Sequence, residues 1–444
     1  MRRDRMPAAI GTSWLHQVGI EDVLCVCLLA FFAMQGAIPG IAPHQSSEMT
    51  NIADTGLMKM AGIGSQVIVN GAICILVLLH SSRLWRFAFA LQWTAVLAAF
   101  AVCSTLWSQD ATTTARRSVP FALATLFGLY LASRFKIRQQ LLTLTATMVV
   151  LALASILLAL FVPSIGLEAS TGHFGNWQGA FTQKNACGRA MVFATAAVLS
   201  LRGKPLVRLC CFALFLFVLV MSGSRGAWLI EGMLLVCYGM LRLLERFNSS
   251  GRMLLLFGSI MIMACTAVAA WIYFPLLAGF VGRDATLTGR TAIWQQVWEA
   301  ILKHPFVGYG FAAFWQGMKG ESYNISLTLH FVVMHAHNGF LEIWLELGAF
   351  GLLVFLLSYM RASRKLWPSL RSAEIGSACW MVFVLFLITV YDLDENTLII
   401  FNGLYWVLYV AAVADIEIMA LECKRHRQLF ELNMSGCVPE HATA

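Results

Sequence analysis

An all-α, polytopic membrane fold is predicted by three properties of this 444-residue sequence. Apolar residues make up 59% of the chain and charged residues only 12%, whereas soluble domains carry about 25% charged residues. Apolar runs of about 20 residues, long enough to cross a bilayer, recur along the chain. These runs lack the alternation of a membrane barrel, and only helices or closed barrels satisfy their backbone groups in lipid.

Twelve such runs are separated by polar segments: 23–42, 62–80, 87–106, 119–133, 140–163, 186–201, 206–222, 227–243, 253–275, 338–360, 372–391 and 398–416. They divide the chain into spans one to nine (1–275), a large polar loop (276–337), spans ten to twelve (338–416) and a tail (417–444). No small-residue cleavage site follows the first run, so we expect it to stay as an anchor. The twelve cysteines lie mostly within the runs and form no metal-binding spacing, which indicates packing residues rather than disulfides.

Loop charge predicts the orientation of the chain. If the N-terminus is cytoplasmic, 21 of the 31 Lys and Arg residues fall on the cytoplasmic side, as the positive-inside rule requires. Both termini are then cytoplasmic and the large loop is outside. Nine cations remain on the outer side: Lys59, Arg116, Arg117, Lys184, Arg225, Arg283, Arg290, Lys303 and Lys319. Together they favour an electropositive vestibule for an anionic ligand; ordinary solvated loop charge or lipid headgroup contact is the alternative.

The large loop, 276–337, is the candidate active-site region. A segment of about 60 residues is far longer than a usual connection, and it is too aromatic for a disordered one. Residues 289–303 (GRTAIWQQVWEAILK) place apolar side chains at helical spacing, which predicts an amphipathic helix at the membrane interface with its tryptophans facing lipid.

Three cations begin predicted outer helix ends, where the helix dipole favours anions. Arg225 lies in the short turn SGSRGAW, Arg290 opens the amphipathic helix, and Lys184, next to Asn185, begins the sixth span. A guanidinium can bind a phosphate through two hydrogen bonds. We therefore expect Arg225, Arg290 and Lys184 to bind an anion, while Arg116-Arg117 suits either a phosphate or lipid anchoring.

The segment His335-Ala-His337-Asn338-Gly339 opens the tenth span. Histidine is the usual proton acceptor near neutral pH, so His337 is the candidate general base. A capped structural imidazole is one alternative. A metal site formed by His335 and His337 is another, although no carboxylate–His–His spacing supports it.

Three further charges, Arg189, Glu231 and Glu342, lie about one turn inside the outer membrane boundary. Intramembrane charges usually pair. We expect Arg189 to pair with Glu231 or Glu342 below the site. The last outer loop carries Asp392 and Asp394, which suit hydrogen bonding to an acceptor sugar or a plain solvated turn.

Several motifs together resemble the O-antigen ligase and polymerase superfamily. His337-Asn338, nine residues, and Gly348-Ala-Phe-Gly351 fit its H-[NSQ]-x9-G-x-x-[GTY] pattern. With WQGAFTQKN, SGSRGAW, LTGRTAIW and HPFVGYGF, residues 90–415 look most similar to the exopolysaccharide polymerase (ExoQ-like) branch. One departure is Gln183, where that branch has His before Lys-Asn.

The resemblance implies a multi-pass enzyme of the bacterial inner membrane that works at its periplasmic face. Its donor would be a polyprenyl-diphosphate-linked oligosaccharide, transferred with inversion to an acceptor sugar without metal or cofactor. Arg225, Arg290 and Lys184 would bind the diphosphate and His337 would activate the acceptor, supported by Asn338, Asn185, Arg189, Glu231 and Glu342. Membrane lipid and other export or chain-length proteins are implied partners, and nucleic acid is not. Two alternatives are a ligase that transfers glycan to lipid A core and a non-catalytic polysaccharide or lipid transporter.

Overall fold

The computed structural model describes residues 19–39, 56–168, 175–247, 250–252, 290–317, 319–371 and 375–434. Over these residues the apolar runs form helices, and no β-strand occurs apart from an isolated bridge between Leu167 and Trp177. The α-helices are α1 Ile20–Ala33, α2 Gly56–Leu79, α3 Ser81–Phe87, α4 Gln92–Cys103, α5 Ala111–Arg134, α6 Ile137–Phe161, α7 Pro163–Gly166, α8 Lys184–Ser200, α9 Pro205–Met221, α10 Arg225–Leu244, α12 Arg290–Lys303, α13 Gly320–Leu329, α14 Gly339–Arg371, α15 Ile375–Asp394 and α16 Leu404–Met434.

The all-α membrane class is confirmed. Five described helices are long and apolar enough to cross a membrane, within α2, α6, α10, α14 and α16. A sixth is possible if Ser81–Ala90 and Gln92–Leu106, bent by 102°, form one broken span. Eleven of the twelve predicted runs coincide with described helices, while 253–275 lies outside the described residues. The count of twelve and the orientation therefore stay predictions. The ten described cysteines are free, as expected.

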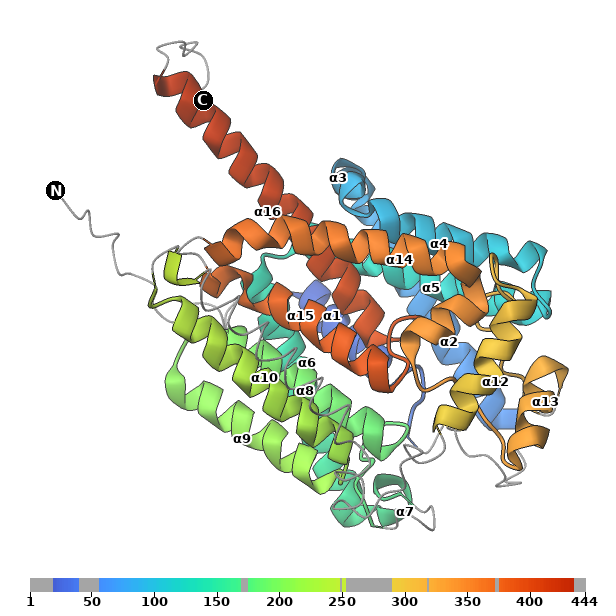
Figure 1. The fold of residues 1–444 in the computed structure, drawn as a ribbon. Helices are drawn as coiled ribbons and strands as arrows, with labels where there is room; N and C mark the ends of the chain where they lie inside the picture. The colour runs from blue at the N-terminus through green and yellow to red at the C-terminus, as the bar shows by residue number, and fades with distance from the viewer. Residues whose placement is uncertain are drawn as a thin grey trace.

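The helices pack side by side in one bundle (Figure 1). At its centre α5 packs along α16, and Gly128 permits the close approach, since a Cβ there would lie 2.8 Å from Val410. Phe121 stacks on Trp406 with ring centroids 4.7 Å apart, and the Trp406 indole donates to Thr125 Oγ1 at 2.9 Å. Helices α12 and α13 lie at one end of the bundle, and α16 projects beyond the opposite end.

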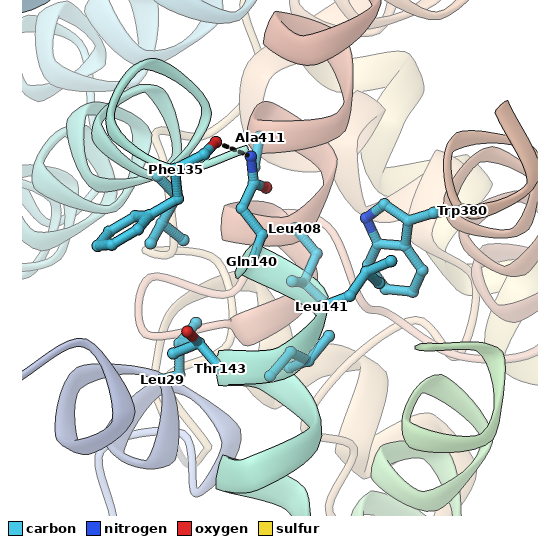
Figure 2. Close-up of a pocket in the computed structure, with 10 residues that line it drawn as sticks. Leu29, Phe135, Gln140, Leu141, Thr143, Trp380, Leu408 and Ala411 are labelled. Atoms are coloured by element: carbon cyan, nitrogen blue, oxygen red, sulfur yellow. Dashed lines mark hydrogen bonds between the residues drawn. The ribbon is translucent and has the colours of Figure 1, made fainter. Parts of the chain in front are cut away.

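Near that opposite end a small, mainly apolar pocket lies beside the start of α6 (Figure 2). The Gln140 amide donates to the Phe135 carbonyl at 3.1 Å and to Asp415 at 3.2 Å. Leu141 and Trp380 line other parts of the wall. The pocket is separate from the outer loops and contains none of the predicted site residues.

Helix α14 is broken near its N-terminal end. Gly348 has φ +67° and ψ −174°, which are not helical values, so the pattern of helical hydrogen bonds is interrupted there. The segment 305–310 fills the break: Ala349 N–H donates to Pro305 O at 2.8 Å, and Tyr309 N–H donates to Leu345 O at 3.0 Å. The HPFVGYGF and GAFG motifs are therefore two halves of one backbone junction.

The loop between α4 and α5, with the first part of α5, contacts residues 307–313 of the large loop. The Trp107 indole donates to Val307 O at 3.0 Å, and Gln109 Nε2 donates to Ala313 O at 2.6 Å. Arg117 Nη1 donates to Ala312 O at 2.7 Å. Arg117 thus supports the loop, and phosphate or lipid contact by Arg116-Arg117 stays a prediction.

The predicted amphipathic helix is α12, but its apolar face is largely covered by protein. Ile293, Val297 and Ile301 pack in a small core with residues of α13 and α14. The Trp294 indole donates to Ala336 O at 2.9 Å, while Trp298 is 44% exposed. The indole N–H of Trp294 thus holds the turn before α14, and lipid contact by the two tryptophans stays a prediction.

Candidate active site

His337 lies in a turn that several hydrogen bonds fix. Its φ is +49°, an uncommon value for a residue other than glycine. Asn338 caps α14, because its Oδ1 accepts from the N–H groups of Phe340 at 3.1 Å and Leu341 at 3.0 Å. Asn338 thus has a structural role that positions the preceding imidazole.

Glu342, one turn into α14, holds the same turn from below. Its carboxylate accepts from the backbone N–H of Ala336 at 2.8 Å and from the Trp315 indole at 2.6 Å. One turn further, Glu346 accepts from the N–H of Ala312 at 2.8 Å. Both carboxylates are buried, so each replaces the water it loses with donors from the large loop.

The acidic loop, which we define as residues 392–397, lies directly opposite this turn. Asp392 is fully buried and accepts from the Thr397 N–H at 2.9 Å and the Thr397 hydroxyl at 2.5 Å. Gly339 permits the contact between the turn and the loop, since a Cβ there would lie 1.9 Å from Asp392 Oδ1. The two segments can approach so closely only because residue 339 has no side chain.

Glu395 brings the predicted cation and the predicted base together. Its Oε1 lies 3.3 Å from His337 Nδ1 and 3.5 Å from Arg290 Nη2, and its Oε2 lies 3.6 Å from His335 Nε2. Arg290 also pairs with Asp394. Burial alone would raise the pKa of Glu395, but the His337 hydrogen bond and nearby positive charges lower it to about 2. Glu395 is therefore a carboxylate at neutral pH.

The two imidazoles are also in contact. The His335 and His337 ring centroids are 3.9 Å apart, and the rings are nearly perpendicular. Burial, with a smaller effect of His337, lowers the pKa of His335 to about 4, although 29% of its side chain stays exposed. His335 is therefore a neutral ring at neutral pH.

The N-terminal ends of α8 and α10 adjoin the acidic loop. Gly226 places the start of α10 beside Asp394, whose Oδ2 would lie 3.3 Å from a Cβ at residue 226. Arg225, the first residue of α10, is exposed at this edge. The Ser224 hydroxyl donates to Asn185 Oδ1 at 3.0 Å, which joins the start of α8, where Lys184 lies, to that of α10.

The predicted ion pair of Arg189 with Glu231 or Glu342 is not formed. Arg189 Nη1 instead donates to Asn396 O at 3.1 Å, and its guanidinium lies over the rings of Tyr391 and Tyr405. Glu231 accepts from Thr195 Oγ1 at 2.7 Å. Arg189 bonds this backbone carbonyl rather than a carboxylate because the acidic loop folds over the end of α8. Arg189 therefore supports that loop directly.

The site is also less positive than the outer cations predict. Arg290 faces two carboxylates, Arg117 is turned into the protein, and Lys303 pairs with Glu321 at 2.9 Å. Arg283 and the side chain of Lys59 lie outside the described residues. The described cations are thus partly neutralised by neighbouring carboxylates, and the site is not uniformly positive.

Sequence reasoning missed Glu395 and underrated Asp394. The only signal was the acidic run Asp392-Leu393-Asp394-Glu395 after a predicted span, which suits a solvated turn equally well. The run follows His337 by more than fifty residues in the sequence, so no spacing pattern predicts a contact between them.

Comparisons with known proteins show which family the chain resembles. The O-antigen ligase family profile matches residues 210–356, which include Arg225, Arg290 and His337. The exopolysaccharide production protein ExoQ of Rhizobium meliloti is 29% identical over 299 residues, covering 64% of this chain and 65% of that protein. A "Putative polysaccharide ligase" of Rickettsia conorii is 27% identical over 185 residues, covering 38% of this chain and 42% of that protein. The chain thus spans less than two thirds of the length of these relatives, and together the matches support the O-antigen ligase/ExoQ-like superfamily.

Proposed function

We propose that this chain is a membrane glycosyltransferase that polymerises polyprenyl-diphosphate-linked oligosaccharide repeats at the periplasmic face of the bacterial inner membrane. The observation that carries the proposal is the convergence of Arg290, His337 and the start of α10 on the acidic loop. An anion site next to a candidate base is what transfer from a diphosphate donor needs.

The chemistry follows from the tautomer of His337. A proton on Nδ1, donated to Glu395, leaves the lone pair of Nε2 free to accept a proton. The acceptor hydroxyl oxygen would attack the anomeric carbon as its proton passes to Nε2. The bond from that carbon to the diphosphate oxygen would break, and the diphosphate would leave with the electron pair, so the configuration inverts.

Charge on the departing diphosphate would be stabilised by Arg225 and Arg290. The starts of α8 and α10 add positive dipole ends at the same place, with Lys184 at the first of them. Because the donor carries its own leaving group, the reaction needs no metal or cofactor. Arg290 would exchange part of its carboxylate pairing for phosphate oxygens when the donor binds.

Two other functions have specific support. The Rickettsia relatives favour a ligase, which would differ in its acceptor. A transporter is favoured by the break in α14 and by Asp415, a buried carboxylate on α16 with one unpartnered oxygen. Purified protein in vesicles with lipid-linked repeats separates the three: longer chains indicate a polymerase, transfer to lipid A core a ligase, and relocation without new bonds a transporter.

Variants test the residue roles. We expect Arg225→Lys, Arg290→Lys and His337→Ala each to reduce turnover by about 10²-fold or more, because a Lys lacks the bidentate fork and an Ala cannot accept a proton. Arg202→Lys, which changes an exposed arginine outside the cluster, is the matched control. Unchanged polymer length in all three variants, at normal membrane levels, would contradict the assignment.

A further inference from the structure

We propose that His335, His337 and Glu395 bind one divalent transition-metal ion, with Zn²⁺ as the representative, and that the bound ion inhibits transfer. The metal site depends only on the geometry of these three side chains. The inhibition rests in addition on the function proposed above.

The spacing of the three groups fits tetrahedral coordination. One ligand atom from each residue lies within 4.8 Å of the others. The Glu395 oxygens lie 3.3 Å from His337 Nδ1 and 3.6 Å from His335 Nε2. Ligands about 2.0–2.1 Å from a tetrahedral Zn²⁺ are about 3.4 Å from one another. An ion therefore needs only small side-chain adjustments to contact all three.

The donor types select the class of metal. Two imidazole nitrogens and one carboxylate oxygen suit Zn²⁺, Co²⁺ and Ni²⁺, whereas Mg²⁺ and Ca²⁺ prefer oxygen ligands. The imidazoles are 29% and 30% exposed. An ion held there would have three protein ligands and a position open to water.

The ligands are held in place by their neighbours, which reduces the cost of arranging them. The turn between the two histidines is fixed by Ala336, whose N–H donates to Glu342 at 2.8 Å and whose carbonyl accepts from Trp294 at 2.9 Å. Glu395 is fixed through its own N–H, which donates to Tyr391 O at 2.7 Å.

Arg290 opposes the ion. Its guanidinium lies 3.5 Å from Glu395 Oε1 and competes for that oxygen. We therefore expect weaker binding than at a dedicated zinc site, and tighter binding when the guanidinium is removed.

Inhibition follows from the tautomer that the metal selects. A metal on His337 Nδ1 takes the lone pair there and leaves the ring proton on Nε2. That nitrogen can then no longer accept the proton of an acceptor hydroxyl. Metal binding and base catalysis by His337 are therefore mutually exclusive.

The binding test uses the full chain purified in detergent with an affinity tag that lacks histidine. Co²⁺ is the spectroscopic probe, and Zn²⁺ is followed by calorimetry in the absence of any donor lipid. We expect one saturable ion per chain, with affinity reduced about 10–100-fold in His335→Ala and Glu395→Gln. His330→Ala removes an exposed histidine of the same loop and should leave the affinity unchanged. Equal affinity in all four proteins would overturn the site.

Two further measurements keep the proposal testable if a variant misfolds. X-ray absorption of the unmodified protein must show two imidazole nitrogens on the ion, and fewer would refute the site. Arg290→Gln must bind the ion more tightly than the unmodified protein, and weaker binding would refute the competition.

Inhibition is measured in a separate experiment, through polymer growth in vesicles. Added Zn²⁺ should stop polymer growth in vesicles, and a chelator should restore it. Binding without any effect on growth would refute the inhibition alone, and growth in a protein that binds no ion would refute the metal site while sparing the proposed function.

Discussion

At the scale of single residues, Glu395 is the most informative side chain of the site. It is only 7% exposed, yet it contacts two imidazoles and one guanidinium. On the function proposed above, a carboxylate in this position would determine which nitrogen of His337 carries the proton.

We expect Glu395→Gln to lower kcat by about 10²-fold with a smaller change in KM. Glutamine has nearly the same shape but is neutral, so His337 loses the acceptor that favours its productive tautomer. Arg290 keeps Asp394 as a partner, so donor binding should persist. Initial rates over a range of lipid-linked donor concentrations provide the measurement.

Glu321→Gln is the control, because it neutralises an ion-paired glutamate of the same large loop that lies in α13. Loss of activity in both variants would mean that general loop charge, rather than the contact with His337, is responsible. A wild-type kcat in Glu395→Gln would remove Glu395 from the mechanism.

Individual residues also show which parts of the site can be predicted from the sequence and which cannot. Arg290 and His337 could be predicted as site residues because a cation at a helix start and a histidine at the start of a span each suggest chemistry locally, and the structure brings both to Glu395. The partners of Arg189 were not identifiable, because a backbone carbonyl such as that of Asn396 carries no residue-type signal. Contacts of this kind depend on how two loops fold over one another.

At the scale of elements, the break in α14 determines where the large loop sits. Gly348 and Gly308 have φ values of +67° and +68°, and each lies against backbone of the other segment. A Cβ would lie 2.2 Å from Phe306 at Gly348 and 2.5 Å from Glu346 at Gly308. Neither backbone can move away without breaking the junction.

Alanine at either position should therefore destabilise the protein by about 3 kcal/mol and lower its membrane level. Gly317→Ala isolates the backbone cost from the steric one: its φ is +63°, but no atom lies within 4 Å of a Cβ there. We expect that variant to lose only about 1 kcal/mol. The apparent Tm in detergent measures the difference, and equal Tm values for the three variants would contradict the steric argument.

Hydropathy predicted the elements themselves well, because apolar runs and their polar boundaries are local properties of the chain. It treated 338–360 as an unbroken span and 87–106 as a straight one. The structure breaks the first at Gly348 and bends the second pair of helices by 102°. A glycine within an apolar run is compatible with a continuous helix, so only the segment that fills the break reveals it.

At the scale of the whole molecule, orientation is the property that the sequence predicts and that fusions can test. Positive charge in the loops places α12 and α13 outside and the end of α16 inside. Alkaline phosphatase inserted after Gly317 should be active, and a fluorescent protein fused at the C-terminus should fluoresce. The reverse pattern would place the candidate site in the cytoplasm, where a periplasmic polymerase cannot work.

The order of the site residues along the chain has a consequence for biosynthesis. Arg225, Arg290 and His337 all leave the ribosome before residues 392–397, which supply the carboxylate that contacts both Arg290 and His337. A nascent chain that stops short of residue 392 has these three groups but lacks the carboxylates that pair with Arg290 and His337. On the function proposed above, prematurely terminated copies should therefore be inactive, and competence should arise only when translation is nearly complete.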